Sequence, residues 1–248
     1  PMKASYEYWK TRWFATRIDY NLSFGYFADG QLVGFVLHGI DDYDNKFSFF
    51  NMGTGVIPAF RGQRIVKQIY DHSYPLMKKA GIQQGVLEVI TTNEKAIKAY
   101  KSAGFKIIRT YHSFNAANLD QKDSHSIKLK ENYKLDDYLH MQDHHLCWEH
   151  NNQTILKDPA QFTAVELKEN DQLCAYALIK KSNKNVTQFG VIDKGWDRYG
   201  TSLFAYIESQ YPAYRIINID AASKSVMAFL KKNDFPPLLD QYEMKVDL

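Results

Sequence analysis

The sequence is poor in cysteine, in proline and in charge of one sign. Its 248 residues include only two cysteines, Cys147 and Cys174, which are too few for a disulfide framework and fit a reducing compartment. Seven prolines and thirteen glycines exclude a collagen-like chain and a Pro/Gly-rich disordered one. Because 45% of the residues are hydrophobic and 24% are charged, we expect an ordinary folded globular protein.

Long apolar runs and basic tails are also missing. No stretch approaches the roughly 18 consecutive apolar residues of a membrane-spanning helix, and the first residues lack the zones of a signal peptide. The 31 basic and 28 acidic side chains leave a formal charge of +3, which is too small an excess to indicate nucleic-acid binding. We therefore predict a cytoplasmic protein without a nucleic-acid or membrane partner. The sequence does not indicate an oligomeric state.

Hydrophobic periodicity in the first half alternates between helix and strand patterns. A helix is expected over 6–19, followed by strands over 22–28 and 31–40 joined by Asp29-Gly30, which suits a two-residue hairpin turn. Pro58 ends a third strand over 47–57, because proline has no N–H to give to a sheet. The other elements expected are a helix over 62–80, a strand over 86–90, a helix over 93–103, a strand over 105–111 and its hairpin partner over 126–129, reached through a polar turn near 118–123. This order predicts an α+β fold with a mixed, mostly antiparallel sheet.

The second half repeats the first in weaker form. Three pairs of anchors recur in the same order: Asp29-Gly30 with Asn170-Asp171, Val56-Ile57 with Val191-Ile192, and Gly104-Phe105 with Asp234-Phe235. The repeated elements are strands over 162–169, 172–180 and 186–192, a helix over 196–210, a strand over 215–220, a helix over 223–232 and a strand over 242–246. We therefore predict a duplication with domains over 1–131 and 132–248.

The strongest local signal runs from Val56 to Val66, where a strand end, a tight turn and a helix start follow one another. A helix start presents unpaired N–H groups and the positive end of the helix dipole, which suit a phosphate or pyrophosphate. Arg61, Arg64 and Lys67 would add charge-assisted contacts. The same residues also fit an ordinary strand-to-helix turn with exposed basic side chains.

A second signal lies downstream, in Glu88 to Asn93 followed by Ala96, Tyr100 and Gly104-Phe105. Asn93 and Tyr100 are seven residues apart, so they share one face of a helix. A tyrosine hydroxyl is protonated at pH 7 and can donate to a departing thiolate. The alternative is that Tyr100 is simply a half-buried residue of an amphipathic helix.

Together the two segments resemble the GNAT family of acetyl-CoA-dependent N-acetyltransferases. The first is similar to the family's pyrophosphate-binding signature, and the second to its Asn-x-x-Ala-x-x-x-Tyr-x-x-x-Gly-Phe signature. The order of elements over 6–130 also matches, although the family's first strand and helix are absent from this chain. The resemblance implies a duplicated GNAT fold with splayed central strands. It also implies transfer of an acetyl group from acetyl-CoA to a small-molecule or peptide amine by direct attack.

The resemblance assigns roles to individual residues. Tyr100 would protonate the departing thiolate, and the N–H of Thr54 would stabilise the developing oxyanion. Glu88 is the candidate general base, with His38 and Asp71-His72 as alternatives. The residues implied to contact the cofactor are Val56 and Ile57 at the strand end, Arg61, Gly62, Gln63, Arg64, Ile65 and Val66 at the turn and helix start, and Asn93 and Ala96 at the next helix start. Of these, Val56 would pair its backbone with the pantetheine arm and Asn93 would hydrogen-bond it.

Some positions depart from the family pattern. Arg64 stands where the family has glycine, and Val66 where it has glycine or alanine. In the second half Ser223 replaces Asn93 and Leu230 replaces Tyr100, and leucine cannot donate a proton. We therefore expect a degenerate, non-catalytic second copy. These departures also leave open a non-catalytic acyl-CoA-binding or partner-binding module.

A metal site is not predicted. His140 and His144 have the i, i+4 spacing of metal-binding pairs on a helix. One such pair supplies only half of a tetrahedral shell, and the motif has no glutamate of the metalloprotease type.

Overall fold

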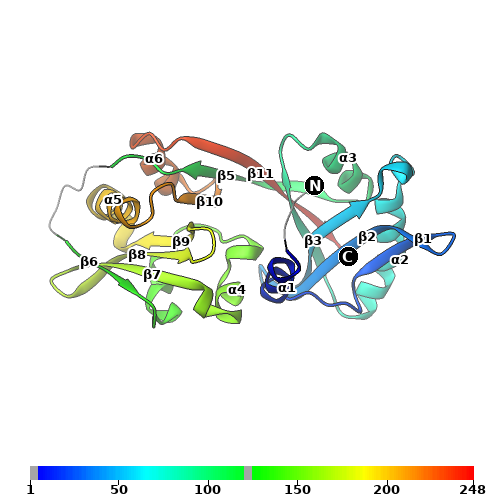
Figure 1. Ribbon diagram of the computed structural model, residues 1–248, viewed down its shortest axis with the longest axis horizontal. Helices are drawn as coiled ribbons and strands as arrows, with labels where there is room; N and C mark the ends of the chain where they lie inside the picture. Colours follow the sequence, from blue (N-terminus) through cyan, green and yellow to red (C-terminus); the bar gives the residue numbers. More distant parts are fainter. Residues whose placement is uncertain (1–4, 120–124) are drawn as a thin grey trace. The chain divides into compact units, whose positions relative to one another are not determined.

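The computed structural model describes residues 5–119 and 125–248 (Figure 1). The chain is a mixed α+β structure with one mostly antiparallel sheet, as the sequence predicts, in the strand order β1-β2-β3-β4-β11-β5-β10-β9-β8-β7-β6. The contacts divide the chain into unit 1, Pro1–Arg109 with Gln241–Leu248, and unit 2, Thr110–Asp240. The division expected near residue 131 therefore lies inside unit 2. Most of the turn expected near 118–123 lies outside the described residues.

Unit 1 is built from short connections between strands and helices. Its elements are α1 (Tyr6–Ala15), β1 (Phe24–Ala28), β2 (Gln31–Tyr43), β3 (Lys46–Val56), η1 (Pro58–Phe60), α2 (Ile65–Lys79), β4 (Gln84–Ile90), α3 (Glu94–Ser102), the first part of β5 (Lys106–Asn115) and the last part of β11 (Pro237–Asp247). Asp29 and Gly30 have φ angles of 48° and 78°, which are the positive values that the predicted hairpin turn requires. Pro58 ends β3 as predicted and opens η1.

Helix α2 packs on one face of this part of the sheet. Its buried residues Ile65, Ile69 and Met77 recur at helical spacing and contact apolar side chains of β2, β3 and β4. Pro75 lies inside α2, which runs on to Lys79. Because Leu87 and Val89 belong to the same core, one face of β4 is turned toward the helix.

The neighbouring parallel strands β3 and β4 separate part-way along their length. Their pairing runs from Ser48 opposite Gln84 to Asn51 opposite Leu87 and then stops, although β3 continues to Val56 and β4 to Ile90. A β-bulge lies at the same level on β3, where Met52 has no partner of its own on β2. The predicted splayed pair of central strands is therefore present, and Asn51 lies at the apex of the split.

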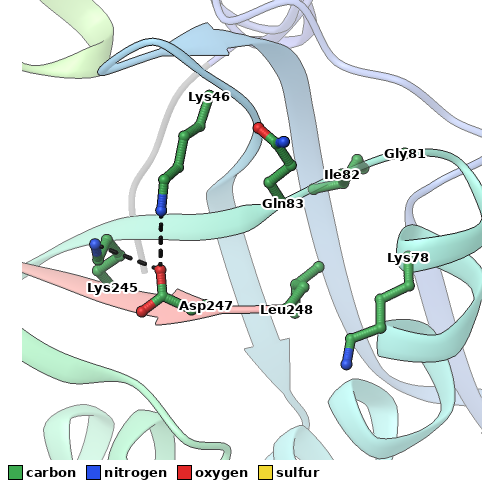
Figure 2. A pocket seen from close by; sticks show the side chains of 8 residues that line it. All are labelled: Lys46, Lys78, Gly81, Ile82, Gln83, Lys245, Asp247 and Leu248. Atoms are coloured by element: carbon green, nitrogen blue, oxygen red, sulfur yellow. Dashed lines mark hydrogen bonds and ion pairs between the residues drawn. The ribbon is translucent and has the colours of Figure 1, made fainter.

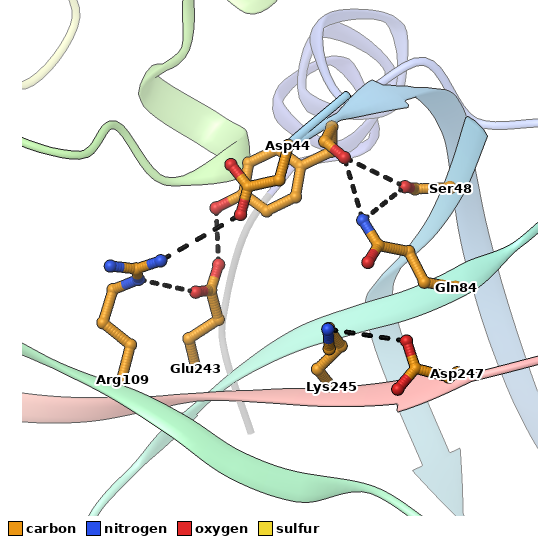
Figure 3. Close-up of polar contacts among 8 residues, drawn as sticks. Asp44, Ser48, Gln84, Arg109, Glu243, Lys245 and Asp247 are labelled. Carbon is orange, nitrogen blue, oxygen red and sulfur yellow. Dashed lines mark hydrogen bonds and ion pairs between the residues drawn. The ribbon is translucent and has the colours of Figure 1, made fainter. Parts of the chain in front are cut away.

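The last strand of the sequence completes the sheet of unit 1. β11 pairs antiparallel with β4, from Gln241 opposite Ile90 to Asp247 opposite Gln84. Met244 on β11 is fully buried in the core beneath α2. The carboxylate of Glu243 accepts hydrogen bonds from the hydroxyl of Tyr43 at 2.5 Å and from Nε of Arg109 at 2.9 Å (Figure 3).

One expected pairing is wrong. The strand over 126–129 was expected to pair with the strand over 105–111, but β6 (Ser126–Lys130) pairs with β7 (Phe162–Glu169). β5 instead pairs with β10 (Arg215–Asp220). In the sheet, β5 lies between β11 and β10, and both of these strands come from the last part of the sequence.

Unit 2 repeats the order of unit 1. Its other elements are η2 (Leu135–Met141), η3 (Trp148–His150), α4 (Asn152–Lys157), η4 (Pro159–Gln161), β8 (Gln172–Lys180), β9 (Asn185–Val191), η5 (Ile192–Lys194), η6 (Trp196–Gly200), α5 (Thr201–Gln210) and α6 (Lys224–Lys232). Two β-bulges recur at matching places: Val33 corresponds to Cys174, and Met52 corresponds to Thr187. These offsets equal those of the sequence anchors, which supports the predicted duplication.

A hollow of about 650 Å³ lies at the start of β4 and is lined by Lys46, Lys78, Lys245, Asp247 and Gln83, among others (Figure 2). It is at the opposite end of β4 from the split. The hollow is therefore separate from the candidate site.

The position of β11 predicts a large effect of truncating Met244. Met244→Ala should lower the free energy of unfolding by about 2–5 kcal/mol, because it leaves a cavity in the core beneath α2. Lys245→Ala on the same strand removes only a surface ion pair at 3.4 Å and should cost less than about 0.5 kcal/mol. Urea denaturation of both variants measures the difference, and equal small effects would contradict this packing of β11.

Candidate active site

A cluster of polar side chains occupies the apex of the split. Nδ2 of Asn51 donates to the hydroxyl of Tyr70 and to Oγ1 of Thr54, both at 2.9 Å. Oγ1 of Thr54 also lies 3.1 Å from Oδ1 of Asn51. Since Asn51 and Tyr70 are buried, these bonds fix the side chains where β3 leaves β4.

Tyr100 joins the cluster from α3. Asn93 caps this helix as predicted, since its Oδ1 accepts a hydrogen bond from the N–H of Ala96 at 3.2 Å. Two turns later the ring of Tyr100 packs edge-on against Phe105, with centroids 6.0 Å apart. Its hydroxyl lies within hydrogen-bonding reach of the side chains of Thr54 and Asn51, so the structure brings the three residues together at the apex.

The hydroxyls of this cluster stay protonated at neutral pH. Burial raises the pKa of Tyr100, while hydrogen bonds with Thr54 and Asn51 lower it in part. Burial also raises the pKa of Tyr70 well above the usual tyrosine value, and the nearby Tyr100 and Tyr74 phenols add to this rise. The split thus contains neutral phenols that can donate protons.

The turn after β3 presents the amide groups that the sequence predicts. No side chain caps α2, and its first intrahelical bond runs from the N–H of Gln68 to the carbonyl of Arg64 at 3.0 Å. The N–H groups of Ile65, Val66 and Lys67 precede that bond and are therefore available at the helix start. Such a start, with the positive end of the helix dipole, suits an anion.

The turn keeps its shape despite the two departures from the family pattern. Arg64 has a φ of 57°, a left-handed conformation that explains why glycine suits this position. Arginine there costs about 1–2 kcal/mol of backbone strain. Ile65 is buried against Gly34 on β2, and Val66 packs against the same core.

The side chains of the turn have local partners. Nε of Arg61 donates to the carbonyl of Val56 at 3.1 Å, and the carbonyl of Gln63 accepts from Nε2 of Gln68 at 2.9 Å. The N–H of Ile57 donates to the carbonyl of Val33 at 3.0 Å and holds the end of β3 to β2. The predicted cofactor residues from Val56 to Val66 therefore form one continuous turn at the mouth of the split.

Glu88 lies on the other face of the sheet from Tyr100. Its neighbours Leu87 and Val89 point into the core beneath α2, so strand alternation turns Glu88 away from the helices. Glu88 is half-buried, and the strand register places it opposite Glu243. Two carboxylates can be cross-strand neighbours here because Arg109 offsets the charge of Glu243.

The alternative bases occupy other environments. His38 is fully buried between the rings of Phe24, Phe49 and Tyr70, and its Nδ1 is 2.7 Å from the carbonyl of Leu22. Asp71 is paired with Nζ of Lys67 at 2.6 Å on the exposed side of α2.

Sequence reasoning missed Asn51 and Tyr70. Asn51 interrupts the apolar run Phe49, Phe50 and Met52, and a polar residue in a buried strand needs a hydrogen-bond partner. That interruption was the available signal. Tyr70 has no such signal, because its spacing on α2 is that of a core residue.

The first part of the chain matches a known family. Residues 2–105 match the sequence profile of the acetyltransferase (GNAT) family. No curated protein sequence matches the chain at a significant level.

Solved structures show the same fold at low sequence identity. A protein of Pyrococcus horikoshii, provisionally assigned as an acetyltransferase, has a TM-score of 0.69 at 11% identity, covering 100% of this chain and 81% of its own. A GCN5-related N-acetyltransferase from Sphaerobacter thermophilus has a TM-score of 0.66 at 12% identity, covering 99% and 86%. A tandem GNAT protein from the clavulanic acid biosynthesis pathway has a TM-score of 0.66 at 11% identity, covering 96% and 87%. These likenesses establish a GNAT fold that extends over both halves of the chain.

Over residues 5–119 and 125–248, no helix has the length and hydropathy to span a bilayer. The same residues contain no group of three or more His, Cys, Asp or Glu side chains arranged to hold a metal ion.

The backbone of the turn predicts different effects for two alanine substitutions. A Cβ at Gly62 or at Gly53 would meet no atom within 4 Å, but only Gly62 has a left-handed φ, of 81°. Gly62→Ala should therefore lower the free energy of unfolding by about 1 kcal/mol, and Gly53→Ala should change it by less than about 0.5 kcal/mol. Chemical denaturation compares the two, and a neutral Gly62→Ala would contradict the left-handed turn.

The buried His38 predicts acid sensitivity. Burial lowers its pKa from 6.5 to about 4. Between these pH values the unfolded chain binds a proton that the folded chain excludes, so stability falls as the pH drops through this window. The loss should reach about 3 kcal/mol by pH 4. His38→Gln should reduce the loss of unfolding free energy between pH 7 and pH 4.5, measured by urea denaturation at both pH values. An equal loss in the variant and the parent chain would contradict the prediction.

Proposed function

We propose that this chain transfers an acetyl group from acetyl-CoA to the amine of a small molecule or peptide, because residues 2–105 match the acetyltransferase (GNAT) family. The observation that carries the proposal is the position of the Tyr100 hydroxyl at the apex of the split, beside Thr54 and Asn51, where burial raises its pKa. Bound there, acetyl-CoA supplies an activated acetyl group on its sulfur.

The residues of the turn fit the anionic part of this co-substrate. The uncapped start of α2 directs the N–H groups of Ile65 and Val66 toward a pyrophosphate, and Arg61 adds charge. Val56 holds the pantetheine arm through its main chain, since the edge of β3 that faces β4 is unpaired beyond Asn51. Asn93 contributes its Nδ2, because its Oδ1 already caps Ala96.

Acid and base act from opposite faces of the same split. Tyr100 donates its proton to the departing thiolate on the helix side, and the N–H of Thr54 donates to the thioester oxygen. Glu88 accepts the proton of the attacking amine on the other face, directly or through water. A gap between two strands is what allows groups on both faces of a sheet to reach one carbonyl.

A second candidate is a module that binds acyl-CoA or a partner without catalysis. Arg64 and Val66, in place of the small residues of the family, are the observation that favours it. Calorimetry with acetyl-CoA, followed by thiol release over a panel of amino acids, polyamines, aminosugars and peptides, separates the two. Binding without thiol release would favour the module, and absence of binding would contradict both.

Removing one hydroxyl tests the proposed acid. Tyr100→Phe should lower kcat by about 100-fold or more with a smaller effect on KM for acetyl-CoA, because the departing thiolate then lacks a proton donor. The measurement is thiol release with whichever amine of the panel supports turnover.

Tyr74→Phe is the matched control. Tyr74 lies one turn after Tyr70 on α2, its pKa is also raised by burial, and its hydroxyl donates to the carbonyl of Ala103 at 2.7 Å. It should keep kcat within about threefold of the parent. Equal turnover in Tyr100→Phe and the parent chain would remove Tyr100 from the role of acid.

A further inference from the structure

Unit 2 contains a second split between parallel strands. β9 and β10 pair only at Asn185 opposite Arg215 and at Val186 opposite Ile216. Beyond these pairs β9 continues to Val191 and β10 to Asp220. The bulge at Thr187 corresponds to Met52, so this gap is the counterpart of the split in unit 1.

A segment that precedes β7 contacts both separated strands. We name residues 141–152 the strap. On the β9 side, Nε2 of Gln188 donates to the carbonyl of His150 at 2.6 Å and to Oδ1 of Asn152 at 3.0 Å. On the β10 side, Nδ2 of Asn218 donates to Sγ of Cys147 at 3.6 Å. The strap therefore bridges the gap that hydrogen bonds between the strands leave open.

The main chain of the strap also touches β9 closely. A Cβ built on Gly190 would lie 2.1 Å from the carbonyl oxygen of Met141, so only glycine allows this approach. Met141, Cys147 and Trp148 are essentially inaccessible to solvent. Oγ1 of Thr154 donates to the carbonyl of Trp148 at 2.7 Å. The strap is thus packed as part of the core of unit 2.

Asp143 connects the strap to the helix starts of unit 2. Its Oδ2 accepts from Nε1 of Trp196 at 3.1 Å and from Oγ of Ser225 at 2.8 Å. Trp196 begins η6, in the place of the turn at Arg61, and Ser225 lies in the first turn of α6, the counterpart of α3. Hydrogen bonds from His144, Ser225 and Trp196 outweigh the effect of burial and keep the pKa of Asp143 low. An ionised carboxylate of the chain therefore contacts two helix starts whose counterparts in unit 1, the starts of α2 and α3, contain the candidate cofactor residues.

We propose that the strap is a built-in occupant of the second split, so that the chain binds one acetyl-CoA, in unit 1, and none in unit 2. The occupancy of the second split stands on the contacts within unit 2, and the single cofactor site in unit 1 rests on the proposed function. Leu230, at the position of Tyr100, is fully buried in the core of unit 2 and agrees with a closed second copy.

Calorimetry and hydrogen exchange on the full chain test the proposal together. Acetyl-CoA should bind with a stoichiometry of one, slow amide exchange in residues 62–67 and leave exchange in the strap unchanged. Binding of two molecules, or faster exchange in the strap on addition of acetyl-CoA, would overturn the closed second copy. If acetyl-CoA does not bind, the proposed function fails. The variants below then still test whether the strap occupies the second split.

Asp143→Ala should speed amide exchange across residues 142–150 by about tenfold or more, because the carboxylate that anchors the strap to Trp196 and Ser225 is gone. Asp137→Ala is the matched control, since Asp137 is an exposed acidic residue of the neighbouring η2. It should leave exchange in the strap unchanged. Exchange in residues 62–67 should not respond to either variant. Fast exchange of the strap in the parent chain, or no effect of Asp143→Ala, would contradict the proposal.

Discussion

The interaction on which the structure depends is the pairing of β4 with β11. A strand can leave one neighbour only if its other edge is held, because buried main-chain groups need partners. β11 pairs with β4 over its whole length, from Gln84 to Ile90, while β3 pairs with β4 only as far as Leu87. The split and its polar cluster are therefore supported from the far side of β4. In unit 2, β5 supports β10 in the same way. β5 pairs with β10 between Arg215 and Asp220, whereas β9 pairs with β10 only at Arg215 and Ile216.

The two faces of the sheet at the split carry groups of different charge. The helix side has neutral hydroxyls, because burial raises the pKa values of Tyr70 and Tyr100. The other side has the carboxylates of Glu88 and Glu243, with Arg109 bound to the latter (Figure 3). The start of α2 adds the positive end of a helix dipole, and no side-chain cap competes there for the amides. The groups proposed as proton donor, proton acceptor and anion site are thus separated by the backbone of one sheet, which prevents them from neutralising one another.

Local chemistry predicted the elements and the turn, whereas long-range pairing could not be predicted. Asp29-Gly30, the cap at Asn93 and the helix start after Gly62 each depend on a few adjacent residues, and the structure has all three. The place of β11 depends on which edge of a distant strand is open, and periodicity does not encode this. For the same reason β6 was assigned to the wrong partner. The packing of residues 141–152 could not be predicted either, because Gln188 and Gly190, which contact this segment, lie much later in the sequence.

The two copies differ in the side chains at the apex of the split. By the offsets of the shared anchors and bulges, Asn51, Thr54 and Tyr100 correspond to Val186, Phe189 and Leu230, and all three replacements are fully buried in the core of unit 2. A polar cluster at an apex costs stability, because each of its groups must be desolvated and then hydrogen-bonded. Replacing it by apolar side chains, and filling the gap with the strap, removes that cost and gives a dry, well-packed unit.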